Sequence, residues 1–471
     1  MLTITFYLLS KPNHPLGKRN TKIQYKCILF KKSQTNTSTI ITKFTNALCI
    51  YCIFDIIFIY FLIMTFSKQD FCIGILRETK NPPDRRVIFS PQTALKFTQE
   101  YPNIKLLIQS SQLRCFNDNE YTELGLTVTD DISMCNILLG VKEVHIPNLI
   151  NNKQYHFFSH THKKQSYNRV LLQQLINQNI TIVDHECLTY PNGMRVVAFG
   201  RWAGIVGAYN GLIAIGKRLG TFNLKRAKDC FDLNEMLEEV KKVILPNNCK
   251  ILITGMGRVA KGAIETLNPL GLKNVKSSDF LHKEFDEPVF CQIDADEYVE
   301  HKNGSWISFP HFFNNPQEYS SIFKPYSKVA DLWIPCHFWD QASPKFLHPD
   351  DYIEDDFKIK IIADVSCDIA DPIPSTLRPS TIAEPFYGYN PKTKTEGDAF
   401  DSNNVTVMAV DNCPGELPRD ASEDFGKIFL EEIIPSIFNK DKNGIIDRAT
   451  ICSKGKLTSK YKYLQSFVDG K

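Results

Sequence analysis

A segment in the middle of the chain, residues 250–271 (KILITGMGRVAKGAIETLNPLG), most constrains what this sequence can fold into. Its apolar run 251–253 is typical of a buried parallel strand, and the apolar residues after the glycines recur at helical spacing. Between them lies the pattern G-x-G-x-x-A. Gly255 permits a tight turn, Gly257 lets the backbone approach a pyrophosphate, and Ala260 lets the helix pack close to the strand. The segment therefore predicts a dinucleotide-binding strand–turn–helix unit, whose helix offers free N–H groups to phosphates.

The residues that follow this helix indicate which dinucleotide binds. Residues 274–279 are expected to form a short second strand that ends in Asp279, about 20 residues past the glycines. A carboxylate at that position accepts a hydrogen bond from the ribose 2′-OH and repels a 2′-phosphate. We therefore expect NAD as the cofactor, while the cations Arg258 and Lys276 keep NADP open as an alternative.

The composition of the 471 residues narrows the class of protein. This length predicts two or three domains. Charged residues make up 23% and the formal net charge is +3, so nothing points to a nucleic-acid partner. The 14 cysteines are scattered without zinc-site spacing, which predicts no structural metal and a reducing, cytoplasmic compartment.

The first 68 residues differ in character from the rest. Residues 47–64 (ALCIYCIFDIIFIYFLIM) form an apolar run long enough for a short membrane span, but Asp55 near its centre argues against one. The favoured interpretation is that Met64 is the initiator and residues 1–63 are an upstream extension of the reading frame. A membrane anchor and another targeting role are the alternatives.

From Phe71 onward the pattern is that of an α/β enzyme. The loop RETKNPPDRRV, residues 77–87, is cationic and stiffened by two prolines, and its arginines suit a substrate carboxylate, although a solvated basic loop has the same composition. Lys142 ends the apolar strand 136–141, at the edge where open α/β sheets bind ligands. A lysine in that position is a candidate for a lowered pKa and for base chemistry.

Two histidines follow the next predicted strand. His160 and His162 are two residues apart and could together ligate zinc, but no third ligand stands nearby at useful spacing. Acid–base use of one of them is the favoured interpretation. Farther along, small residues at 200, 203, 204, 207, 208 and 211 leave one face of a long predicted helix nearly bare, as expected of a helix that packs against neighbouring backbone.

Seven segments occur in the order found in a known family. They are RETKNPPDRRV, LLGVKE, FFSHTHKKQ, GMRVVAFGRWAG, LITGMGRVAKGA, IIADVSCDIADPIPST and DNCPGELPRDAS. Together they resemble the NAD-dependent, lysine-forming saccharopine dehydrogenases, and the alanine dehydrogenase and transhydrogenase superfamily has looser versions of the same segments. The resemblance covers residues 71 to about 440. Phe338, where a tyrosine is usual, and the additional His162 depart from the family pattern.

The resemblance implies a role for individual residues. Lys142 corresponds to the family's general base and His160 to its general acid. The residues implied to bind substrate are Arg77, Arg86, Gln165, Arg195 and Phe199. The residues implied to line the cofactor site are Gly255, Gly257, Arg258, Asp279, Phe338, Ala363, Asp364, Val365, Ser366 and Asp411.

The sequence thus predicts an α/β fold with two Rossmann-like domains, in which the dinucleotide domain is inserted into the substrate domain. The expected parts are an extension over 1–68, a catalytic domain over 69–200, an NAD-binding domain over 201–419 and a helical return over 420–471. The implied reaction interconverts saccharopine with lysine and 2-oxoglutarate. An alanine dehydrogenase-like enzyme and a catalytically silent nucleotide-binding protein are the rival functions.

Overall fold

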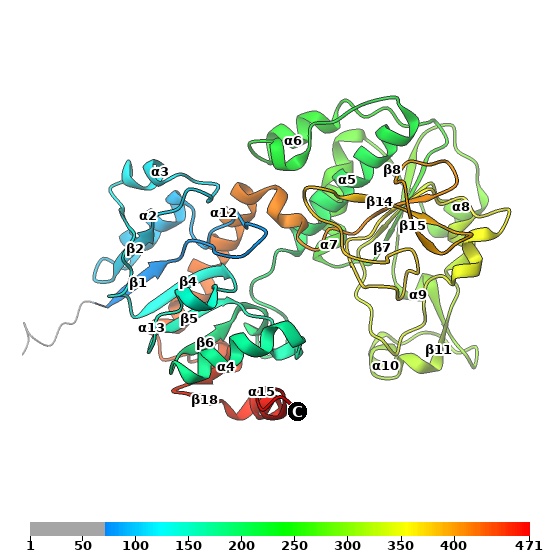
Figure 1. Cartoon of the computed structure of the whole chain (residues 1–471). Coiled ribbons are helices and arrows are strands. Elements are labelled where there is room, and N and C mark those ends of the chain that lie inside the picture. The colour runs from blue at the N-terminus through cyan, green and yellow to red at the C-terminus, as the bar shows by residue number, and fades with distance from the viewer. Residues whose placement is uncertain (1–70) are drawn as a thin grey trace, which may run out of the picture. The chain divides into compact units, whose positions relative to one another are not determined.

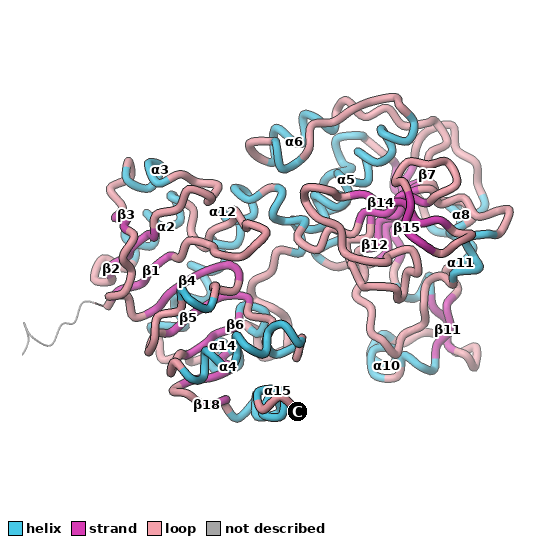
Figure 2. Tube along the Cα trace, viewed as in Figure 1, coloured by secondary structure: helices cyan, strands magenta, loops and turns pink. Residues whose placement is uncertain are grey.

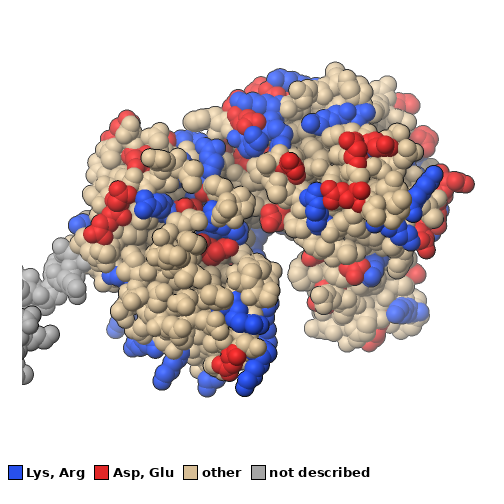
Figure 3. Space-filling model, in the orientation of Figure 1, with Lys and Arg blue, Asp and Glu red and all other residues tan. Residues whose placement is uncertain are grey.

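The computed structural model describes residues 71–471, so the predictions made for residues 1–68 lie outside the described part of the chain. None of the helices in this part combines the length and the apolar character needed to cross a membrane. Figure 3 shows Lys and Arg side chains interspersed with Asp and Glu over the face drawn, as expected from 55 basic and 52 acidic residues in the whole sequence.

The first of two large sheets has eight strands in the order β18-β17-β6-β5-β4-β1-β2-β3. The six from β6 to β3 are parallel, while β17 and β18 are antiparallel at one edge. Their bounds are β1 Cys72–Ile75, β2 Lys105–Gln109, β3 Thr127–Thr129, β4 Ile137–Lys142, β5 Gln154–Phe158, β6 Thr181–Asp184, β17 Thr450–Ser453 and β18 Lys456–Leu457. Figure 1 labels β1, β2, β4, β5, β6 and β18 of this sheet. The chain runs outward from β1 to β3 and then from β4 to β6 on the other side, so β1 and β4 form the topological switch point.

The second sheet has eight strands in the order β15-β14-β16-β13-β12-β7-β9-β8. It is parallel except for β14 and β15, which pair antiparallel with each other and with β16. Figure 2 shows strands of this sheet in magenta. Its strands are β7 Lys250–Thr254, β8 Lys273–Asn274, β9 Val289–Ile293, β12 Leu332–Pro335, β13 Ile361–Ala363, β14 Phe386–Asn390, β15 Thr395–Gly397 and β16 Val405–Met408. A separate antiparallel pair joins β10 (Val299–His301) to β11 (Tyr319–Ser321). The switch point of this sheet lies between β7 and β12.

Helices cover both faces of each sheet, which explains why the strands read as nearly continuous apolar runs. Beside the first sheet lie α2 Pro91–Glu100, α3 Asp118–Thr122, α4 Arg169–Asn177, α12 Pro418–Ile428, α13 Ile434–Phe438, α14 Ile445–Ala449 and α15 Gln465–Val468. With the second sheet belong α5 Gly200–Leu219, α6 Leu233–Val240, α7 Arg258–Leu267, α8 Ser277–His282, α9 Ala295–Tyr298, α10 Phe309–Asn314 and α11 Lys324–Ser327.

Helix α5 packs through its bare face, as its small residues predict. A Cβ atom added to Gly204 would lie 1.8 Å from the carbonyl oxygen of Val259 in α7. The reciprocal glycine of α7, Gly262, would meet the carbonyl oxygen of Arg201 at 2.0 Å. Farther along α5, Gly207 faces Val365, just past β13. The two helices therefore touch through backbone, and α5 is held against α7 and the end of β13.

Two local predictions are wrong. The second strand expected over 274–279 is only two residues long, because the polar run after Val275 begins helix α8 instead. The sequence also predicts a helix over residues 423–437 with Ser422 as its N-cap, but the helix starts at Pro418, which occupies its first turn. Ser422 lies inside that helix, where its hydroxyl donates to the carbonyl of Pro418 (2.6 Å) and accepts from the backbone N–H of Val87 (3.0 Å).

The architecture confirms the expected fold class, an α/β fold with two parallel-dominated sheets of Rossmann type. All strands of the second sheet come between β6 and β17 of the first sheet along the chain, so the nucleotide-binding unit is an insertion. The antiparallel edge formed by β17 and β18 is an element that the sequence analysis, which expected a helical return, did not foresee.

Candidate active site and dinucleotide site

Lys142 lies at the switch point of the first sheet. It is the last residue of β4, which pairs with β1 on one side and β5 on the other, and its Cα partner on β5 is Phe158. Burial, followed by the nearby charges of Arg86 and Lys80, lowers the pKa of Lys142 to about 8. An amine with this pKa is neutral in about a tenth of the molecules at pH 7 and in about half at pH 8, so it can accept a proton.

A carboxylate that the sequence analysis did not single out holds the end of β4. Glu78 accepts hydrogen bonds from the backbone N–H groups of Val141 (2.7 Å) and Lys142 (2.8 Å). Burial, together with the neighbouring charge of Asp84, raises the pKa of Glu78 to about 8. Glu78 follows β1, so the rule that ligands gather at strand carboxyl ends could have identified it.

Arg86 is buried rather than free. Its guanidinium makes two hydrogen bonds to the carboxylate of Asp84, at 3.0 and 2.6 Å, and a third to the side chain of Asn412, at 2.7 Å. It also lies over the ring of Phe199, 4.2 Å from the centroid. Burial opposes ionisation of Asp84, but the paired Arg86 outweighs burial and lowers the pKa of that carboxyl. A substrate carboxylate would therefore have to share Arg86 with Asp84.

His160 stands on a turn that a buried carboxylate organises. The turn follows β5, and His160 adopts the left-handed conformation with φ 53°. Asp184, at the carboxyl end of β6, accepts from the backbone N–H groups of Ser159 (3.1 Å), His160 (3.0 Å) and Glu186 (2.8 Å). Burial, and then the charge of Lys142, lowers the pKa of His160, so its ring is mainly neutral at pH 7.

Glu186 gathers several of the candidate residues around one carboxylate. Lys163 (2.9 Å) and Arg195 (2.5 Å) form ion pairs with it, and the Nε2 atoms of His162 and His160 lie 3.6 and 4.0 Å from its Oε2. Glu186 was not predicted as a site residue, although it follows the end of β6 by only two residues. The carboxyl edge of the first sheet thus carries Lys142, whose charge acts on His160, and Glu186, which lies beside His160.

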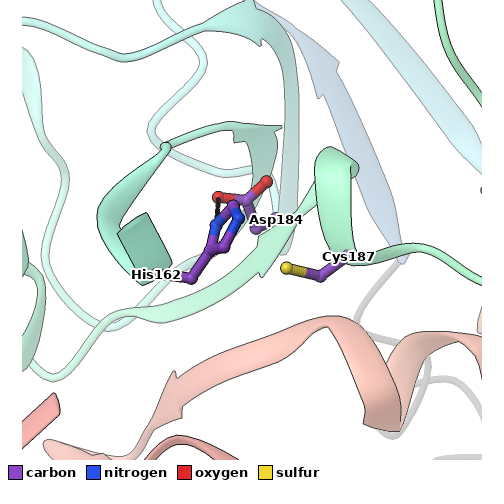
Figure 4. Close-up of side chains that lie close together, drawn as sticks. All are labelled: His162, Asp184 and Cys187. Carbon is purple, nitrogen blue, oxygen red and sulfur yellow. Dashed lines mark ion pairs between the residues drawn. The ribbon is translucent and has the colours of Figure 1, made fainter. Parts of the chain in front are cut away.

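Figure 4 shows His162 with its ring turned toward Asp184 and with Cys187 beside it. The Nδ1 atom of His162 lies 3.7 Å from the Asp184 carboxylate. Burial alone would lower the pKa of His162, but Asp184 and Cys187 outweigh burial and raise the pKa to about 10. The three side chains are close enough to hold a metal ion, yet both oxygens of Asp184 already accept backbone hydrogen bonds. Oδ2 accepts from Ser159 and His160, and Oδ1 accepts from Glu186. We therefore interpret this cluster as a protonated histidine that supports the turn.

The remaining residues predicted to bind substrate are spread out. Arg77 is exposed and pairs with Asp130 at 3.0 Å, with a further hydrogen bond to the carbonyl of Ser110. Gln165 is exposed and accepts from the hydroxyl of Tyr167 at 2.7 Å. Arg195 joins Glu186, and Phe199 stacks on Phe425 with ring centroids 4.5 Å apart. The structure brings Arg86, Arg195 and Phe199 toward the candidate catalytic residues, Lys142 and His160. Arg77 instead contacts residues that follow β2 and β3.

The glycine turn after β7 has the geometry of a dinucleotide site. Gly255 has φ 102°, and a Cβ atom there would lie 2.8 Å from the carbonyl oxygen of Cys336 after β12, so only glycine fits at this switch point. Gly257 caps α7, and no atom lies within 4 Å of its would-be Cβ, which leaves space for a ligand. Ala260 is fully buried against the strand. This turn and the start of α7 fit a pyrophosphate.

The structure offers a second candidate for the ribose carboxylate in addition to Asp279. Asp279 lies in α8 and forms an ion pair with Lys283 at 3.0 Å. The strand beside β7 is β9, and the residue that follows it is Asp294. Topology therefore places Asp294 at the strand end where a ribose is bound in folds of this class.

The other residues predicted to line the cofactor site occupy varied environments. Ala363 ends β13, and Val365 packs against Gly207 of α5. Asp364 is fully buried and accepts hydrogen bonds from Ser366 and from the hydroxyl of Thr376 (2.7 Å), which makes it a structural anchor of the loop. The side chains of Phe338, Arg258 and Asp411 are exposed, and Ser366 is partly buried.

Three kinds of comparison relate the chain to known proteins. Residues 74–206 match the family model "Alanine dehydrogenase/PNT, N-terminal domain". Alpha-aminoadipic semialdehyde synthase of Arabidopsis thaliana is 29% identical over 83% of this chain and 41% of its own length. The Mus musculus protein of that name, described as mitochondrial, is 27% identical over 85% of this chain and 48% of its own length. The chain thus spans less than half the length of these relatives.

A shorter relative is covered almost completely. Saccharopine dehydrogenase [NAD(+), L-lysine-forming] of Yarrowia lipolytica is 25% identical over 76% of this chain and 90% of its own length. Among solved structures, an L-alanine dehydrogenase superposes with a TM-score of 0.56 at 14% identity, covering 85% of this chain and 99% of that one. The structural match shows the same fold. The sequence matches relate the chain to proteins named alpha-aminoadipic semialdehyde synthase and saccharopine dehydrogenase, and residues 74–206 to the alanine dehydrogenase/PNT N-terminal domain.

Proposed function

We propose that this chain is an NAD-dependent oxidoreductase that interconverts saccharopine with L-lysine and 2-oxoglutarate. The observation that carries the proposal is the placement of Lys142 at the end of β4 and of His160 just after the neighbouring strand β5, near enough for the charge of Lys142 to lower the pKa of His160. The pKa of Lys142 is lowered as well. A reaction at a secondary amine needs one group to accept its proton and another to move protons as water adds. The names of the relatives supply the substrate class.

In the lysine-forming direction, Lys142 in its neutral form takes the proton from the secondary amine of saccharopine. When bound at Gly255 and Gly257, the nicotinamide dinucleotide supplies the acceptor for the hydride that leaves the adjacent carbon. His160 then moves protons as water adds to the resulting imine, and as the carbinolamine breaks its C–N bond to yield lysine and 2-oxoglutarate. Positioned proton transfer of this kind contributes about 10²- to 10⁴-fold to the rate.

Cationic side chains beside the pair support a substrate with several carboxylates. The side chains of Arg195 and Lys163 are 47% and 44% exposed, and both contact Glu186. Either can turn from Glu186 to a substrate carboxylate, because the exposed part of each side chain is free to move. Arg86, held by Asp84 and Asn412, offers a fixed cation beside the amine of Lys142. Guanidinium groups suit this task because they bind carboxylates in a bidentate manner.

The direct test is turnover by the purified full-length chain. Oxidation of NADH would be followed with lysine plus 2-oxoglutarate, with pyruvate plus ammonia, and with NADPH in place of NADH. We expect oxidation with the first pair and NADH. Oxidation only with pyruvate and ammonia would assign an alanine dehydrogenase activity instead, and no turnover with any pair would favour a silent nucleotide-binding protein.

A variant assigns the chemistry to its residue. Lys142→Met is expected to lose at least about 100-fold in kcat while NADH binding, measured by fluorescence titration, stays within about twofold. Lys105→Met is the matched control, since Lys105 is exposed on β2 of the same sheet. Unchanged turnover in Lys142→Met would remove this residue from the mechanism.

A further inference from the structure

A second group of ligand-type side chains lies in the segment between β9 and β12, away from the residues discussed so far. His301 ends β10, His311 lies in α10, and Glu318 ends a 3₁₀ turn, Pro316–Glu318. The Nε2 atoms of His301 and His311 lie 3.4 and 3.8 Å from the same carboxylate oxygen, Oε2 of Glu318. All three ligand atoms lie within 4.8 Å of one another.

These separations suit a shared metal ion better than direct hydrogen bonds. An N–H···O hydrogen bond closes to about 2.7–3.2 Å, and neither histidine reaches Glu318 at that distance. Ligand atoms that each lie about 2.0–2.1 Å from a tetrahedral zinc ion are about 3.3 Å apart. The observed 3.4 and 3.8 Å are near that value, although the 47% exposed side chain of Glu318 is free to swing into solvent.

The second ring nitrogen of His311 has a partner that suits metal binding, whereas that of His301 has to change its partner when a metal binds. His311 Nδ1 lies 3.1 Å from the hydroxyl of the buried Tyr319, so Nδ1–H can donate to this oxygen and leave the Nε2 lone pair free. Such a partner for the non-ligating nitrogen is typical of metal-bound histidine. His301 Nδ1 accepts from the backbone N–H of Asn303 at 3.2 Å. A metal at Nε2 would put the proton on Nδ1, and the exposed Asn303 N–H would then turn to water.

We propose that His301, His311 and Glu318 bind a divalent transition-metal ion of the zinc class. Two imidazoles and one carboxylate are ligands that zinc prefers, and the exposure of His311 and Glu318 leaves a fourth position for water. The ion joins β10, α10 and the turn before β11, which also contact one another through the β10–β11 pair and through the ring of Phe312 against Tyr319. Its role is to fasten this segment, so it is independent of the proposed reaction. The sequence analysis predicted no structural metal because these ligands are ten and seven residues apart and lack any recognised spacing.

The test is a metal titration of the full-length protein after treatment with a chelator. We expect one Zn²⁺ to bind at this site and to raise the thermal midpoint. Cobalt substituted at this site should show d–d absorption without thiolate-to-metal charge transfer. Strong charge-transfer absorption would place the ion at a cysteine, such as Cys187 beside His162, and would overturn the proposal.

Variants separate loss of a ligand from loss of the fold. Glu318→Gln and His301→Asn should each weaken Zn²⁺ binding by about 100-fold or more, and Tyr319→Phe, which keeps the ring, by about 10- to 100-fold through His311. His282→Asn, at an exposed histidine of α8, is the control and should bind as the parent does. Equal Zn²⁺ stoichiometry and affinity in the parent and in folded Glu318→Gln would refute the site, as would no binding by the parent.

Discussion

Removing the Lys142 amine should stabilise the protein while it abolishes activity. Burial lowers the pKa of Lys142 from 10.5 to about 8, which means that the folded protein resists the charged form. Each pKa unit corresponds to about 1.4 kcal/mol, so the charged amine costs about 3 kcal/mol at most. Lys142→Met keeps the length of the side chain without the charge and should therefore gain up to that amount in free energy of unfolding at pH 7.

The stability difference between Lys142→Met and the parent should depend on pH. Below pH 8 the amine is charged in both the folded and the unfolded chain, so the whole penalty acts on the parent protein. Between pH 8 and 10.5 the unfolded chain holds more protons, and the stability contributed at this position rises with pH. The difference between Lys142→Met and the parent should thus be largest below pH 8 and shrink above it.

Urea denaturation at pH 7 and pH 9 measures both quantities, with Lys105→Met as the exposed control, whose stability should stay within about 0.5 kcal/mol of the parent. In the same preparations, oxidation of saccharopine by the parent should rise with pH as Lys142 loses its proton near pH 8. A variant that is less stable than the parent at pH 7, or a stability difference that grows with pH, would refute the assignment of a buried, charge-destabilised amine.

Three further changes probe the nucleotide-binding unit. Gly204→Ala should lower the free energy of unfolding by at least about 1–3 kcal/mol, because its Cβ would lie 1.8 Å from the carbonyl oxygen of Val259. Thermal denaturation measures this loss, and an unchanged midpoint would contradict the backbone contact. Gly257→Ala should leave the stability nearly unchanged, because no atom lies within 4 Å of the position of the added Cβ. It should weaken NADH binding about tenfold, and an unchanged affinity would show that the pyrophosphate binds elsewhere. Asp294→Ala should weaken NADH binding about tenfold, whereas Asp279→Ala should leave NADH binding unchanged. The opposite result would identify Asp279 as the ribose ligand.

The sequence predicts correctly those parts of the fold that depend on a pattern among neighbouring residues. The strand–turn–helix at 250–271 has its glycines, its apolar run and its helical period within 22 consecutive residues, and it occurs as expected. Lys142 could be placed at a strand end because an apolar run stops just before it. Residues 274–279 could not be assigned correctly, because a single apolar residue, Val275, gives no strand alternation and the serines that follow favour a helix start.

Features that depend on distant contacts were not predictable. Glu78 and Glu186 follow strand ends, which makes them candidates for the site, but the backbone and cationic groups that they bind come from distant parts of the chain. The burial of Arg86 against Asp84 and Asn412 depends on a contact across 326 positions. His301, His311 and Glu318 come together only when β10 pairs with β11.

The strand β17 completes the edge of the first sheet from the far side of the inserted unit, and this couples the two sheets energetically. Thr181 and Ser453, which hydrogen-bond across that edge, are 272 positions apart. Closing a flexible loop of that length costs about 5 kcal/mol in chain entropy. When the inserted unit is folded, its two ends are already held in place, so most of this loss of chain entropy does not oppose the pairing of β17 with β6. Loosening the nucleotide-binding unit should therefore release β17 and expose the edge of β6, so damage in one sheet becomes an aggregation risk in the other.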